Sequence, residues 1–62
     1  MPKLQVQRLT STDEWVRWVD CDDFEVAEAS HIMIAGLNTR GGNWRVIDRS
    51  NGRVLVVAMV AS

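Results

Sequence analysis

The chain has 62 residues, a formal net charge of −1 and 47% hydrophobic side chains, so it is expected to form one domain, residues 1–62, with a small core. Its single cysteine excludes an internal disulfide, and one cysteine with one histidine falls short of a structural zinc site. No metal or cofactor is therefore expected, and oligomerisation remains as the means of completing the core. We expect no signal peptide and no membrane span, and the lone thiol fits a cytoplasmic location.

Two strands are predicted in the first third of the chain. Apolar and polar residues alternate over residues 3–9 at the period of a half-buried strand. Residues 15–19 are interpreted as the second strand, because Trp-Val-Arg-Trp-Val is rich in strand formers. A helix is the alternative for residues 11–20, since Ser11 and Glu14 match a capping box.

A helix is predicted over residues 23–38. Asp22 is the expected N-cap and Glu25 the third helical residue, and acidic side chains in the first turn suit the helix dipole. Ile32 lies nearly opposite the apolar face of this helix and is expected at the surface. The apolar face, which is expected to cover the sheet, comprises Val26, Ala27, Ser30, Met33, Ile34 and Leu37.

The C-terminal third is predicted to form a β-hairpin. Asn51-Gly52 is typical of a two-residue type I′ loop, here between strands at residues 44–49 and 53–60. That turn makes Val46 face Val57. One face then carries Trp44, Val46, Leu55, Val57 and Met59 and suits the helix, and the other carries Ile47, Val54, Val56 and Ala58 beside Arg45 and Arg49.

These elements predict an α+β fold of order β-β-α-β-β, with an antiparallel sheet and one helix packed on one face. The last strand is apolar on both faces, and one helix can cover only one of them. A second copy is therefore expected to cover the other face in a homodimer. The expected dimer interface comprises Ile47, Val54, Val56 and Ala58.

No motif predicts an enzyme. Cys21 and His31 are the one pair suited to nucleophilic catalysis, but their separation favours a packed thiol and a histidine at the helix edge. The acidic residues of segment 20–28 lack the glycine and glutamate spacing of a calcium loop and are interpreted as capping and solvated groups. Gly41-Gly42 follows a helix instead of preceding one, which favours a helix stop over a phosphate site.

Tryptophan and arginine, the residue types common in binding hot spots, supply the candidate binding site: Trp15, Arg17, Trp18, Arg45, Arg49 and Arg53. We therefore expect a small non-enzymatic module that binds a protein partner as an adaptor or inhibitor, of a kind that viral and mobile genomes often encode. Binding of nucleic acid or a small anionic nucleotide through the arginine-rich hairpin is the alternative.

Overall fold

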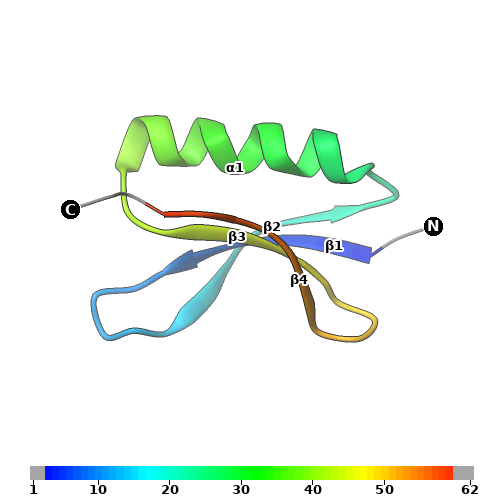
Figure 1. Cartoon of the computed structure of the whole chain (residues 1–62), viewed down its shortest axis with the longest axis horizontal. Coiled ribbons are helices and arrows are strands. Elements are labelled where there is room, and N and C mark those ends of the chain that lie inside the picture. Colours follow the sequence, from blue (N-terminus) through cyan, green and yellow to red (C-terminus); the bar gives the residue numbers. More distant parts are fainter. Residues whose placement is uncertain (1–2, 60–62) are drawn as a thin grey trace.

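The computed structural model describes residues 3–59. In chain order these residues form β1 (Lys3–Leu9), β2 (Trp15–Asp22), α1 (Val26–Arg40), β3 (Trp44–Asp48) and β4 (Arg53–Ala58). The four antiparallel strands form one open sheet in the order β2-β1-β3-β4, and α1 lies over one of its faces (Figure 1). The fold is α+β, as the sequence predicts. Within the described range, no helix is long and apolar enough to cross a membrane.

The segment with two interpretations is a strand. β2 pairs with β1 along its whole length, because aromatic and β-branched side chains suit a pleated surface that has a neighbouring strand to pack on. The turn before β2 is held by Thr10, whose Oγ1 accepts hydrogen bonds from the backbone N–H groups of Thr12 and Glu14. A β-bulge follows at Trp18, since Val6 faces Val19 whereas Gln7 faces Arg17.

Helix α1 begins three residues later than predicted. Strand β2 continues to Asp22 and Asp23 turns the chain with a φ of 66°, so Asp22 cannot be the N-cap. Glu25 is the N-cap and forms a reciprocal capping box with Glu28, whose side chain accepts the Glu25 N–H at 3.1 Å. The helix ends at Arg40, and Gly41 follows with a φ of 67°.

The helix face that covers the sheet also differs from the prediction. Ala29, Met33 and Gly36 are the buried helix residues, Ile32 and Leu37 pack at the margin of the core, and Val26 and Ile34 are exposed. The size of Trp44 explains the difference, because its ring lies directly against Gly36 and fixes which side of α1 faces the sheet. The fully buried side chains of this core are Leu4, Val6, Cys21, Met33, Trp44 and Val46.

The predicted register of the C-terminal hairpin is wrong by two residues next to the turn and by one residue beyond Leu55. Val46 faces Val56 and Trp44 faces Ala58, so Val56 and Ala58 pack on the helix side and not on the open face. The connection spans four residues, because Gly52 N–H donates to Asp48 O at 2.7 Å and the Asp48 carboxylate accepts the Ser50 N–H. A bulge at Leu55 then reduces the shift in register, because Ile47 faces Val54 whereas its neighbour Val46 faces Val56.

Candidate functional site

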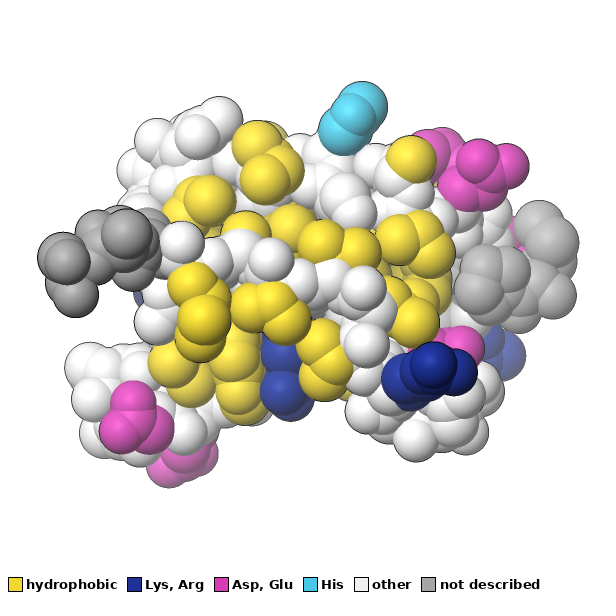
Figure 2. All heavy atoms as spheres, viewed as in Figure 1, with side chains coloured by type: hydrophobic (Ala, Val, Ile, Leu, Met, Phe, Trp, Pro, Cys, Tyr) yellow, Lys and Arg dark blue, Asp and Glu magenta, His cyan; other side chains and the backbone are white. Residues whose placement is uncertain are grey.

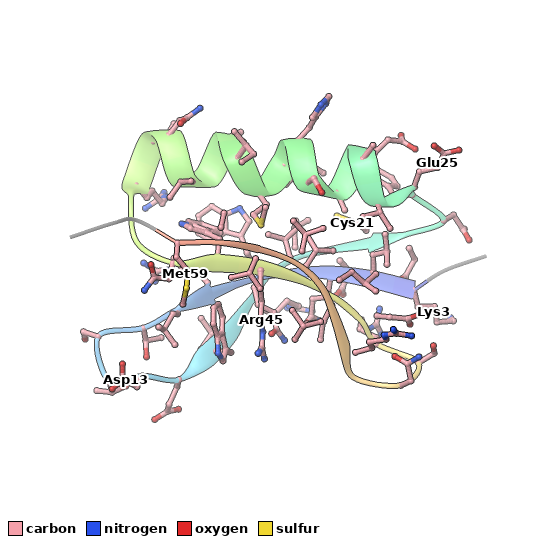
Figure 3. All side chains as sticks on the ribbon, viewed as in Figure 1. Lys3, Asp13, Cys21, Glu25, Arg45 and Met59 are labelled. Atoms are coloured by element: carbon pink, nitrogen blue, oxygen red, sulfur yellow. The ribbon has the colours of Figure 1, made fainter. Side chains whose placement is uncertain are left out.

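The sheet face opposite α1 carries an arginine packed on a tryptophan. The Arg45 guanidinium carbon lies 4.2 Å from the centre of the Trp15 ring, and Arg45 Nε donates a hydrogen bond to Gln7 Oε1 at 2.7 Å. Figure 3 shows Arg45 pointing from the sheet away from the helix. Partial burial lowers the pKa of Arg45, which nevertheless stays charged. The two side chains come from β2 and β3, which lie on either side of β1.

A row of polar side chains continues from this pair across the open face. Gln7 Nε2 donates to Gln5 Oε1 at 2.8 Å, and Gln5 Nε2 donates to Asp20 Oδ1 at 2.8 Å. The hydrogen bond from Gln5 is the largest cause of the lowered pKa of Asp20; burial opposes it, and the charges of Arg49 and Arg17 lower the pKa further. The glutamines thus connect the arginine of β3 to the carboxylate of β2.

Two of the predicted binding arginines form ion pairs with Asp20 and Asp22 of β2. Arg17 lies 3.4 Å from Asp20, and Arg49 lies 3.0 Å from Asp22 and 3.7 Å from Asp20. Arg53 is exposed at the start of β4, where its side chain makes no ion pair with the described residues. Among the described residues, Arg49 is thus the one hairpin arginine whose charge is balanced by carboxylates of the sheet.

Apolar side chains lie beside this polar row, toward β4. Val57 faces Arg45 and is 51% exposed, and Met59, just after β4, is 65% exposed. Val54 faces the half-buried Ile47, and Val54 and Leu55 are exposed. In Figure 2 hydrophobic atoms cover the middle of this side of the molecule, with basic atoms enclosed among them. The open face thus combines a fixed arginine with an apolar margin.

Trp18 belongs to a different surface. Its ring meets Trp44 edge to face, with the centres 5.0 Å apart and the planes at 85°, and the Arg40 guanidinium lies 5.0 Å from the centre of the Trp18 ring. The bulge in β2 takes Trp18 out of the regular alternation. Trp18 is 39% exposed and partly covers the end of the core near the helix C-terminus.

The structure therefore brings some of the predicted site residues together and separates others. Trp15 and Arg45 are in contact, and Arg17 and Arg49 meet at Asp20, whereas Trp18 and Arg53 lie apart from both groups. Arg45 of β3, and not Arg17 of the same strand as Trp15, packs on the Trp15 ring. Sequence reasoning missed three residues of the polar row, and their polarity at alternate positions of neighbouring strands was the available signal: Gln5, Gln7 and Asp20.

Groups with reactive chemistry are not assembled into a site in the described structure. Cys21 is buried, and its burial, followed by the charges of Asp20 and Asp22, raises the pKa of its thiol, which disfavours the nucleophilic thiolate. His31 is exposed on α1. Among residues 3–59, no group of three or more histidine, cysteine, aspartate or glutamate side chains is placed to hold a metal ion, and no cavity is found.

Comparison of the chain with protein-family models, with curated proteins and with solved structures found no match in any of the three.

Proposed function

We propose that the chain is a non-enzymatic protein-binding module, acting as an adaptor or inhibitor, and that it binds its partner through the open sheet face around Trp15 and Arg45. The observation that carries this proposal is the packing of Arg45 on the Trp15 ring, held by Gln7, on the face that α1 does not cover.

The geometry of this face suits a protein surface. Interfaces are anchored by a few aromatic and arginine side chains with apolar neighbours, and Trp15 and Arg45 lie close to Ile47 and Val57. Because Gln7 and Trp15 already fix the Arg45 side chain, binding would cost less conformational entropy than ordering a free arginine. A face without a cavity also fits a broad partner better than a small ligand.

The charge layout favours a protein over a nucleic acid. Phosphate binding needs arginines whose charge is available, but Arg17 and Arg49 are paired with Asp20 and Asp22 on the same face. The two carboxylates would repel a phosphate backbone placed across the sheet. The arginine-rich hairpin therefore supports the nucleotide alternative less well.

A homodimer is part of the proposal. Of the predicted interface residues, Val56 and Ala58 pack with the core, while Val54 is exposed and Ile47 is half-buried among its neighbours. The polar row from Asp20 to Gln7 occupies much of the open face. These features support a dimer contact at β4 better than a contact across the whole open face.

Replacing Trp15 tests the proposed binding face. Tagged wild-type, Trp15→Ala and Ile34→Ala chains would be used for quantitative co-purification, and any protein retained would be purified for titration. Ile34→Ala is the matched control, since Ile34 is an exposed apolar residue on the helix. We expect Trp15→Ala to weaken the affinity at least tenfold, roughly the effect of losing a hot-spot residue, and Ile34→Ala to leave it unchanged.

Circular dichroism would establish that the variants are folded. Equal dissociation constants for folded Trp15→Ala and wild type would contradict the proposal.

A further inference from the structure

The two edges of the sheet differ in how they are protected. β4 lies at one end of the strand order and, within the described chain, pairs with β3 alone, so half of its backbone N–H and C=O groups point outward. From Val54 to Met59 it carries no charged residue and no proline. Such an edge is open to pairing with another strand.

β2, at the opposite edge, carries the features that prevent pairing. Arg17, Asp20 and Asp22 place charges along β2, whereas β4 carries none after Arg53. Each edge strand has one bulge, at Trp18 in β2 and at Leu55 in β4, so the charges are what distinguish the two edges. Only one of the two edges is therefore suited to add a strand. Pairing at that edge between two copies leaves β2 at both outer edges, so growth of the sheet stops at two copies.

From these observations we infer that β4 pairs edge to edge with β4 of a second copy, in antiparallel orientation, to form one continuous sheet across a two-fold dimer. This inference rests on the proposed homodimer, to which it gives a geometry, and not on the proposed partner-binding role of Trp15 and Arg45.

The charge pattern supports a second copy in this orientation. Arg53, at the start of β4, is the one charged residue of the strand. Parallel pairing would place two Arg53 side chains together, whereas antiparallel pairing separates them to opposite ends of the contact. Figure 3 shows Met59 at the same end of the molecule as Asp13 in the turn between β1 and β2, so antiparallel pairing moves Arg53 toward the end of the partner that carries this acidic turn.

The apolar surface around β4 supplies contact area beyond the backbone. A stable interface buries about 800 Å² on each partner, which is about a fifth of the 4175 Å² accessible surface of this chain. A short strand edge needs additional side chains to reach that size. Figure 2 shows hydrophobic atoms across the middle of the β4 side. The exposed apolar side chains in β4 or directly after it are Val54, Leu55, Val57 and Met59.

The dimer would hold both open faces on the same side of one sheet. Each copy then presents its own Trp15–Arg45 pair in the same direction, which permits two-site binding to a partner.

The test combines solution mass with backbone protection. Wild type is expected to show twice the chain mass of 7.0 kDa by light scattering. Val57→Lys, which adds a charge to the exposed edge, is expected to return the mass to that of one chain. Ile34→Lys places the same charge on an exposed helix residue and is expected to keep the dimer mass, as is Trp15→Ala.

Amide hydrogen exchange on the wild type shows which surface forms the contact without relying on a variant. Outward-pointing amides of β4 are expected to exchange more slowly as the protein concentration rises, whereas amides of β2 are expected to keep their rates. A single-chain mass, a mass above two chains, a Val57→Lys dimer, or β4 amides whose exchange does not depend on concentration would each overturn the inference. If the Trp15→Ala variant keeps the dimer mass but no longer binds the partner protein, the result would support both the β4 dimer and the binding face at Trp15 and Arg45.

Discussion

Trp44 is the residue that joins the helix to the sheet. Its side chain is fully buried, its Nε1 donates a hydrogen bond to Gly41 O at 2.7 Å, and its ring lies against Gly36. A Cβ atom added at position 36 would approach the ring to 2.7 Å, closer than such contacts occur. Glycine is therefore required at this position by the close approach of the helix to the indole.

Gly36→Ala is expected to destabilise the fold. Overpacking costs about 1–3 kcal/mol, and the better helix propensity of alanine offsets about 1 kcal/mol of that, so we expect a net loss of about 1 kcal/mol in the free energy of unfolding. Urea denaturation would measure the change.

Trp44→Phe provides the control for this prediction. The atoms that block a Cβ at position 36 are Cη2, Cζ3 and Cζ2 at the far edge of the indole, which the shorter phenylalanine side chain does not reach. In the Trp44→Phe background, Gly36→Ala is expected to become neutral or stabilising. A loss that persists there would show that the crowding has another source.

At the scale of the elements, the polar row joins three strands on the open face. Asp20 accepts a hydrogen bond from Gln5 of β1 and lies near Arg49, which follows β3. Both interactions favour the ionised carboxylate and lower its pKa. Because the folded state lowers the pKa of Asp20, its contribution to stability is present above the pKa of the unfolded chain and is lost as the pH falls through the folded value.

Asp20→Asn is expected to remove part of the acid sensitivity of the fold. Wild type should lose stability as the pH falls below about 4, and the variant should lose less over the same interval. Urea midpoints measured for both proteins at pH 7 and at pH 2.5 would give the difference. Asp13→Asn is a suitable control, because Asp13 lies in the turn after β1, outside the polar row. Equal acid losses for wild type and Asp20→Asn would contradict the assignment.

At the scale of the whole molecule, acidic and basic residues that are separated in the sequence are adjacent on the sheet. The sequence places acids in the middle of the chain and arginines after them, and the fold brings Asp20 and Asp22 of β2 to Arg49. This pairing reduces the positive potential that a polyanion would need.

We therefore expect weak binding to single-stranded oligonucleotides. At physiological salt the dissociation constant should be above about 10⁻⁴ M, the weak end of non-specific binding, as measured by fluorescence anisotropy. The double variant Asp20→Asn, Asp22→Asn leaves Arg49 without its carboxylate partners and is expected to bind more tightly. Micromolar binding by the wild type, with a steep log-linear dependence on salt, would instead favour the nucleotide alternative.

The sequence by itself determined the class of fold and most of the elements. The alternation over residues 3–9 predicted β1 with its observed bounds. The run of strand formers predicted β2 over residues 15–19, and the strand in the structure continues to Asp22. Both depend on periodicity and side-chain preference, which a local stretch of sequence contains. The helix was located from the same kind of pattern, within three residues at each end.

Only the tertiary structure decided which faces and which partners these elements have. The four-residue turn after Asp48 and the bulge at Leu55 moved Val56 and Ala58 to the helix side, and Trp44 selected the face of α1 that carries Gly36. The contact of Arg45 with Trp15 joins strands separated by β1, so no local spacing could predict it. Register and side-chain contacts depend on the volume and hydrogen bonds of neighbours distant in the sequence, and these are fixed only when the sheet and the helix pack together.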